Sequence, residues 1–542
     1  MQFTVDGRSV EIPDDGDTLL GALRDRLGIE AVKDGCSPQG QCGCCTVLVD
    51  DAPRVACVTP ARRVAGRNIT TAAGLSHDEQ QRWSEAFVAC GASQCGFCTP
   101  GIVCRLVGHE RRGADLRDRT TVDKALAAHL CRCTGWQTIR EAAERVSTGS
   151  AGSSAGPPDR ASDIDRSAAA ERAQLETGGP QHTDTTTVLG AVAFGADGAP
   201  QDALFAIAAS ADNDDRDRWV VAETLPQARR SAGKVQGRRT TLEPIPPIAV
   251  PDPPPGEQWD ICLATCWTEP GYLETDAAWC EPGAEPSDPL ANGGAFGGKA
   301  ASGVGNEARR LADELGRPVR VLWSREDTVR RGPKRPPLAA GLRADGTGII
   351  RIARTPGATD ILKTVLPAAT IEEVDVPGPP TSLALRAATW SEAQMLATAL
   401  EQMRTSDKAA TTITSTGTGS AEVTSPNGAT ARAEVGPEQI NVHIAAGNPL
   451  DPVTLRSYVI GAAHMAWSWV TSESLAVDEH GEVQDLTIRS FGIARSAETP
   501  NIKVTITPSP LPPVPAGEAV FAAVAAATWQ SQGTPPHLPT GR

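Results

Sequence analysis

The sequence lacks the features that direct a protein to a membrane or to nucleic acid. It has no cluster of basic residues, no apolar run near the roughly 18 residues of a membrane span, and no charged-then-apolar or twin-arginine leader. Its net charge is −15 over 542 residues. We therefore expect a cytoplasmic protein that binds neither nucleic acid nor an anionic membrane. No P-loop, Rossmann fingerprint or Ser–His–Asp signature is present.

Cysteines are numerous and unevenly distributed. Eleven of the 14 lie before residue 134, and only Cys262, Cys266 and Cys280 lie beyond it. In a long chain without a secretion signal, metal binding explains such a set better than disulfides do.

The first cysteine set lies in KDGCSPQGQCGCCTV and the VAC that follows. Cys36, Cys42 and Cys45 share one Gly-rich loop, and Cys57 returns from a later strand. Plant-type ferredoxins use the spacing C-x4-C-x2-C and a later cysteine. This loop has one residue more between its first two cysteines, which leaves open whether Cys44 or Cys45 is the ligand.

The second cysteine set lies in QCGFCTPG and LCRCTGW. Cys95 and Cys98 form a C-x2-C pair, and Cys131 and Cys133 form a C-x-C pair at the ends of predicted helices. Two sets of four thiolates favour two iron–sulfur clusters. Structural zinc is the alternative, although C-x-C is less usual for zinc. The remaining Cys44, Cys90 and Cys104 are expected to be packed small residues.

Composition and periodicity predict an α+β multidomain chain. We expect a small β-rich domain, a domain of four helices, a flexible linker rich in Gly, Ser and Ala, and a mixed α/β body; their ranges are 1–76, 77–147, 148–182 and 183–542. The predicted helices of the second domain are 78–89, 99–109, 121–130 and 137–146, and those of the body are 306–315, 391–403, 452–473 and 517–529.

The motifs GCSPQGQCGCCTV, QCGFCTPG and LCRCTGW resemble the iron–sulfur subunit of the xanthine oxidase family of molybdenum hydroxylases. The resemblance implies that residues 1–76 form a β-grasp ferredoxin-like domain and residues 77–147 a four-helix [2Fe–2S] domain. Two [2Fe–2S] clusters are implied as well, one on Cys36, Cys42, Cys45 and Cys57 and the other on Cys95, Cys98, Cys131 and Cys133. It also implies that the helical cluster lies nearest a molybdopterin, that Gln94 contacts the pterin, and that the β-grasp cluster passes electrons to a flavin.

The body resembles the molybdopterin-binding large subunit of the same family. The string NGGAFGGK, at 292–299, matches a loop that presents a backbone amide to a molybdenum oxygen, so Gly294, Phe296, Gly297 and Gly298 are its implied cofactor-binding residues. The body has about half the family's usual length. Between Met403 and Asn441 we expect only a Ser-, Thr- and Gly-rich bridge.

Two further residues follow from the resemblance. A late Gly–Glu motif supplies the family's general base, and Glu518 matches it by position; an exposed glutamate in the first turn of a helix is the alternative. An Arg–Gly element orients substrate in the family, and Arg386 is the nearest match, with Ala387 in place of the glycine.

We therefore expect an iron–sulfur electron-transfer component of a molybdenum hydroxylase complex. It would form a hetero-oligomer with an FAD-binding subunit and a full-length molybdopterin subunit, since no flavin-binding segment is visible. A self-contained compact hydroxylase acting on an N-heterocycle or aldehyde is the alternative, with molybdopterin on this chain. A non-catalytic scaffold is the third interpretation.

Overall fold

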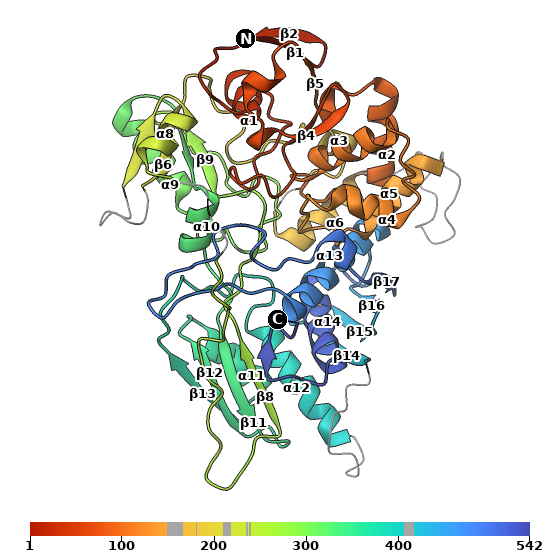
Figure 1. Cartoon of the computed structure of the whole chain (residues 1–542). Coiled ribbons are helices and arrows are strands. Elements are labelled where there is room, and N and C mark those ends of the chain that lie inside the picture. Colours follow the sequence, from red (N-terminus) through yellow and green to blue (C-terminus); the bar gives the residue numbers. More distant parts are fainter. Residues whose placement is uncertain are drawn as a thin grey trace.

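The computed structural model describes residues 1–148, 166–179, 181–209, 218–234, 237, 240–405 and 417–541. Figure 1 shows a small β-sheet domain at one end, a helical domain beside it, and a larger body below. Among the described residues, no helix is long and apolar enough to cross a bilayer.

A five-stranded sheet of order β2-β1-β5-β3-β4 forms the first domain. Alternation buries Phe3 and Val5 on one face of β1, and β1 pairs with β5 in parallel. Thr18 caps the short helix α1, which continues into a π-helical segment, Ala22–Arg26. The elements are β1 (Gln2–Val5), β2 (Arg8–Glu11), α1 (Leu19–Gly21), β3 (Thr46–Val49), β4 (Ala52–Val55) and β5 (Asn68–Thr70).

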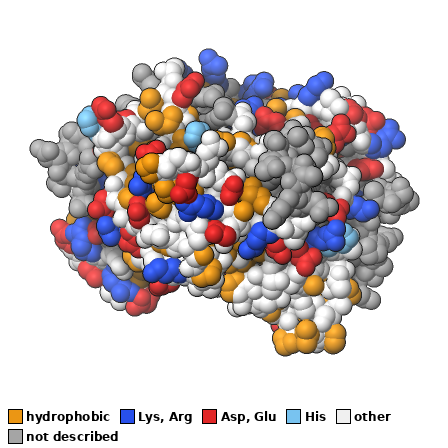
Figure 2. Space-filling model, turned by 90° about the horizontal axis from the view of Figure 1, so that it is seen from below, with side chains coloured by type: hydrophobic (Ala, Val, Ile, Leu, Met, Phe, Trp, Pro, Cys, Tyr) orange, Lys and Arg blue, Asp and Glu red, His pale blue; other side chains and the backbone are white. Residues whose placement is uncertain are grey.

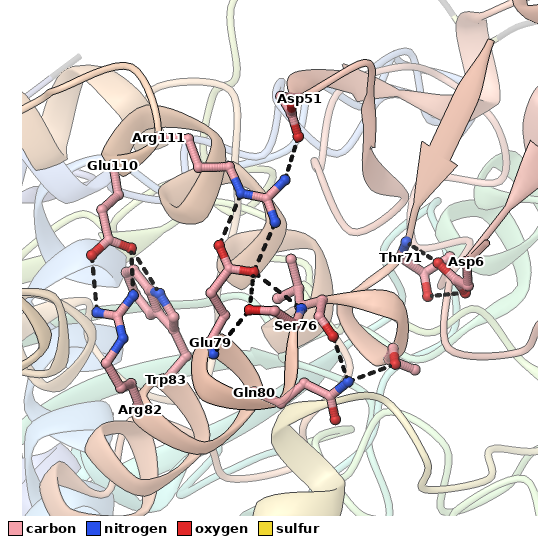
Figure 3. A network of polar contacts seen from close by, with 12 residues as sticks. Asp6, Asp51, Thr71, Ser76, Glu79, Gln80, Arg82, Trp83, Glu110 and Arg111 are labelled. Atoms are coloured by element: carbon pink, nitrogen blue, oxygen red, sulfur yellow. Dashed lines mark hydrogen bonds and ion pairs between the residues drawn. The ribbon is translucent and has the colours of Figure 1, made fainter.

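Four helices form the second domain. They are α2 (His77–Cys90), α3 (Thr99–Glu110), α4 (Arg119–Leu126) and α5 (Gln137–Thr148), close to the predicted ranges. Ser76 and Glu79 form a capping box at the start of α2. Arg111, after α3, donates to the Glu79 carboxylate at 2.7 and 2.9 Å and also pairs with Asp51, so it ties both helices to the sheet domain (Figure 3).

A small α/β lobe lies beside the sheet domain (Figure 1). Its sheet has the order β7-β6-β10-β9 and is flanked by α8 and α9. The elements are β6 (Leu204–Ala208), β7 (Trp219–Ala222), α8 (Leu225–Ser231), β9 (Ala277–Cys280), α9 (Val304–Leu315), β10 (Val319–Leu322) and α10 (Arg325–Arg331).

Two further sheets complete the body, with orders β13-β12-β11-β8-β18 and β14-β15-β16-β17. Helix α14 is buried on nearly every side and contacts α12, α13 and β14. The strands are β8 (Ile261–Thr265), β11 (Leu338–Leu342), β12 (Gly348–Ala353), β13 (Ala369–Val374), β14 (Gly419–Thr424), β15 (Thr430–Val435), β16 (Gln439–Ala445), β17 (Asn501–Ile506) and β18 (His537–Leu538). The helices are α11 (Ala358–Val365), α12 (Trp390–Thr405), α13 (Pro452–Thr471) and α14 (Gly517–Ser531).

The structure corrects two expectations about connecting segments. The predicted linker contains α6 (Arg166–Thr177), which packs against α13, and α7 (Thr185–Val188) follows it; residues 149–165 lie outside the described part. The predicted bridge contains β14 and β15, paired around an Asn427–Gly428 turn, while residues 406–416 are not described. Many of the apolar side chains that these segments bury are alanines.

Positive and negative side chains are interspersed over the face shown in Figure 2, with no broad area of one sign.

Candidate functional site

The first cysteine set comes from two segments. Three of its members lie between α1 and β3, and the fourth follows β4. Cys36, Cys42, Cys45 and Cys57 are at most 3% exposed. Hydrogen bonds from the Cys42 and Cys57 thiols hold the pKa of Cys36 well below its ordinary value. The peptide N–H of Gln39 donates to Cys36 Sγ at 3.1 Å, and that of Cys57 donates to Cys45 Sγ at 3.4 Å. Thiols and amide donors therefore face one buried point.

Cys44 and Cys45 face different neighbours. Cys45 shares a thiol contact with Cys57, whereas the Cys44 thiol hydrogen-bonds to Cys42 and interacts with Cys131 of the second set. Cys45 is thus grouped with the first set, and Cys44 lies between the two sets.

The second set is arranged as two pairs of thiols. Cys95 Sγ lies 3.4 Å from Cys133 Sγ, and Cys98 hydrogen-bonds to Cys131. The Cys98 hydrogen bond, with a further one from Thr134 at 3.1 Å, lowers the pKa of Cys131 to about 7. The corresponding pKa values of Cys98 and Cys133 are raised, because each thiol donates a hydrogen bond to its partner and is buried.

This arrangement fits [2Fe–2S] clusters, in which two thiolates bind each iron. Burial removes the thiols from water, and the amide donors can stabilise the sulfurs. Across the described residues, no three Cys, His, Asp or Glu side chains converge as a site for a single metal ion. The chemistry available to such a pair of centres is one-electron transfer.

A backbone hydrogen bond joins the two cysteine sets. The peptide N–H of Leu130, which precedes Cys131, donates to the Cys42 carbonyl at 2.9 Å. Nearby, a Cβ on Gly101 would lie 2.5 Å from the carbonyl oxygens of Gly43 and Cys44, so α3 approaches the first loop as closely as a glycine permits.

The glycine-rich loop of the body forms one wall of the second set. A Cβ on Gly294, whose φ is +80°, would lie 2.9 Å from Cys95 Sγ. The Asn292 side-chain amide donates to the Cys95 carbonyl at 2.6 Å. The structure therefore brings the predicted loop to the second set, as close as its glycines allow.

Gln94 and Arg386 also lie in this region. The Gln94 amide donates to the Cys133 carbonyl at 3.0 Å and to Ser457 Oγ at 2.9 Å. The Arg386 guanidinium lies 5.0 Å from the centre of the Phe296 ring, and burial lowers its pKa. A Cβ on Gly297 would lie 1.8 Å from the Ala384 carbonyl oxygen, so only glycine fits there.

Glu518 does not join this group. It is exposed in the first turn of α14 and is not among the residues that line the adjoining cavity. That cavity has a volume of about 30 Å³, and its walls include Arg132, Phe296, Arg386, Trp469 and Phe521. Such a space holds about two water molecules. In this conformation the residues do not fit a molybdopterin, so we derive no reaction step through one.

Two buried ion pairs near the second set were not anticipated from the sequence. Arg172 and Glu176 of α6 form a fully buried pair at 2.7 Å, and Glu176 accepts from the N–H groups of Ala516 and Gly517 at the start of α14. Arg132, between Cys131 and Cys133, pairs with Glu473. The i,i+4 spacing of Arg172 and Glu176 was the available signal for the first pair.

Comparison with known proteins assigns both cysteine sets to described families. Residues 3–62 match the family described as "2Fe-2S iron-sulfur cluster binding domain", and residues 71–144 match "[2Fe-2S] binding domain". A probable xanthine dehydrogenase subunit of Bacillus subtilis is 35% identical over 146 residues, which are 27% of this chain and 83% of that protein.

Two longer proteins are also similar. The aldehyde oxidoreductase of Megalodesulfovibrio gigas is 39% identical over 145 residues, which are 26% of this chain but only 16% of that protein. A solved aldehyde oxidoreductase from Desulfovibrio gigas superposes with a TM-score of 0.69 and 15% identity, covering 99% of both chains. At that identity the superposition establishes a shared fold.

Proposed function

Since the chain belongs to the xanthine dehydrogenase and aldehyde oxidoreductase family of oxidoreductases, we propose that it is the iron–sulfur electron-transfer component of a molybdenum hydroxylase complex. One observation carries the proposal: two buried four-thiol sets are joined by the hydrogen bond from Leu130 to the Cys42 carbonyl. Cys36, Cys42, Cys45 and Cys57 would hold one [2Fe–2S] cluster. Cys95, Cys98, Cys131 and Cys133 would hold the other.

Electrons would enter at the second set and leave at the first. The second set supports the entry role because the body covers it through Asn292 and Gly294. The first set belongs to the sheet domain at the far end of the molecule (Figure 1). A flavin or another acceptor would then meet the sheet domain.

The body would dock partner subunits instead of performing the hydroxylation itself. The cavity beside Arg386 holds about two water molecules, and Glu518 does not face it. We therefore propose a full-length molybdopterin subunit and an FAD-binding subunit as partners. Similarity to short proteins that are named as single subunits, such as the Bacillus subtilis relative, supports a hetero-oligomer.

One observation favours the alternative of a self-contained hydroxylase. The loop with Gly294, Phe296, Gly297 and Gly298 lies against the second cysteine set, close to Gln94. In that alternative, molybdopterin would bind at this loop, Arg386 would orient the substrate, and Glu518 would need to turn inward as the base.

Metals and cofactors can be quantified in the chain purified with its native partners. This measurement distinguishes the electron-transfer component from the self-contained hydroxylase. We expect about four iron and about four acid-labile sulfides per chain, with molybdenum and FAD on separate subunits. Molybdenum retained by the isolated chain would establish the alternative. Zinc in place of iron would refute the electron-transfer function and support a scaffold.

A further inference from the structure

The cavity beside Arg386 has a positive charge in excess. Its charged wall residues other than Arg386 all belong to buried ion pairs, which are Arg132–Glu473, Arg335–Glu392 and Lys334–Glu269. Among the described residues, no carboxylate forms an ion pair with Arg386, and no atom accepts a hydrogen bond from its guanidinium. The N–H donors of this side chain are therefore available to a ligand.

Glu176 does not cancel this charge. A Cβ on Gly517 would lie 3.5 Å from Glu176 Oε2 and 3.7 Å from Arg386 Cζ, so the two groups flank this glycine. Glu176 is already paired with Arg172 and accepts from the N–H groups of Ala516 and Gly517. Burial lowers the pKa of Arg386 in spite of Glu176. A buried cation without a counter-ion of its own is costly, and an anion bound beside it offsets that cost.

The size and lining of the cavity restrict the anion that it can hold. Its volume of about 30 Å³ is that of about two water molecules, which accommodates a monatomic anion but not a tetrahedral oxyanion. Phe296 and Arg386 are half-buried while the other wall residues are buried, so an ion enters beside these two. The carboxylates of Glu269 and Glu473 repel any further negative charge. The cavity therefore suits a small monovalent anion.

We propose that this cavity binds one chloride ion, held by the guanidinium of Arg386, and that the bound ion lowers the midpoint potential of the cluster on the second cysteine set. Arg386 interacts electrostatically with Cys133, so its positive charge favours the reduced and more negative state of a cluster held there. A chloride ion beside Arg386 cancels that charge. Chloride binding itself is independent of the proposed function, whereas the effect on the potential rests on it.

Chloride binding is measured on the full chain with its clusters by the broadening of the chloride NMR line. Sodium gluconate, whose anion is too large for the cavity, keeps the ionic strength constant. Arg386→Gln should weaken binding about tenfold, because hydrogen bonds to a charged partner are lost. Arg386→Lys keeps the charge and should bind more tightly than Arg386→Gln. Arg404→Gln removes an exposed arginine at the end of α12, so this matched control should bind as wild type does.

Urea unfolding separates a binding site from an arginine that only supports the fold. In gluconate, Arg386→Gln should be at least as stable as wild type, because the substitution removes a buried cation that has no counter-ion. Chloride should then stabilise wild type and leave Arg386→Gln unchanged, since only a protein that binds the ion gains stability from it. A variant that is less stable than wild type in gluconate would contradict the inference.

An EPR-monitored redox titration tests the effect on the cluster. The midpoint potential of the second cluster should be lower in chloride than in gluconate for wild type, and equal in both salts for Arg386→Gln. Line broadening that is absent, or that Arg386→Gln leaves unchanged, would overturn the site, and equal potentials in wild type would overturn its effect on the cluster. Each of these results leaves the electron-transfer function standing. A chain without iron would refute that function, while chloride binding could still be measured on it.

Discussion

Arg132 and Glu473 form a buried, two-pronged ion pair between the second cysteine set and the body. Nη1 and Nη2 of Arg132 donate to the two carboxylate oxygens of Glu473 at 2.5 and 2.6 Å, and the side chains are 4% and 1% exposed. Nε of Arg132 donates to the Pro270 carbonyl at 3.1 Å. The guanidinium is thereby held on the body, and Arg132 lies between two proposed ligands, Cys131 and Cys133, in the sequence.

Removal of the Glu473 carboxylate should destabilise the protein and change the second cluster. Glu473→Ala leaves Arg132 buried without a counter-charge, which costs about 3–5 kcal/mol of unfolding free energy. The loss of a negative charge should also raise the midpoint potential of the cluster held by the second set. Urea unfolding and an EPR-monitored redox titration measure the two effects. Glu479→Ala, at an exposed position nearby, should change neither.

Serine at a proposed ligand should remove one cluster. Cys131→Ser should lower the iron content from about four to about two per chain and abolish one EPR signal, because an alcohol binds iron poorly in place of a thiolate. Cys104→Ser is the matched control, since Cys104 is buried but faces neither set. An equal loss of iron in both variants would show that general destabilisation is responsible.

Glu176 should contribute strongly to stability despite its place in a segment that the composition describes as a linker. Glu176→Ala leaves the buried Arg172 unpaired and removes the acceptor at the start of α14, at a cost of about 3 kcal/mol or more. Urea unfolding measures the difference. Glu171→Ala, exposed on the same helix, should cost less than about 0.5 kcal/mol.

His464 should make stability fall as the pH falls below about 6.5. Burial, with Arg132 and Arg140 nearby, lowers its pKa to about 3, so the folded protein keeps it neutral while the unfolded chain takes up a proton. Between about pH 7 and about pH 5.5 this difference costs about 1 kcal/mol. Urea unfolding at both values should show that His464→Gln loses correspondingly less than wild type. Equal losses would contradict the prediction.

The cysteine loops and the long helices could be anticipated because their signals are local. Ser76 and Glu79 mark the start of α2 by the capping box alone. Cys95 and Cys98 are recognisable by spacing, since thiolates must converge on an iron–sulfur core.

The features that the sequence did not predict depend on contacts between distant segments. Arg172 and Glu176 suggest a solvated helix, and they are buried only because α13 and the start of α14 cover them. The strands β14 and β15 bury Ala421 and Ala433, which add too little hydrophobicity to outweigh a Ser- and Thr-rich composition. Glu518 matches the family's late Gly–Glu motif by its position in the sequence, and such a match does not determine which way a side chain points.

The contact of Asn292 and Gly294 with Cys95 has a consequence for assembly. The second cysteine set acquires part of its enclosure from residues almost two hundred positions further along the same chain. Covalent tethering gives this contact a high effective concentration, independent of how dilute the protein is. When the two halves share one polypeptide, dilution cannot uncover the second set by dissociating them.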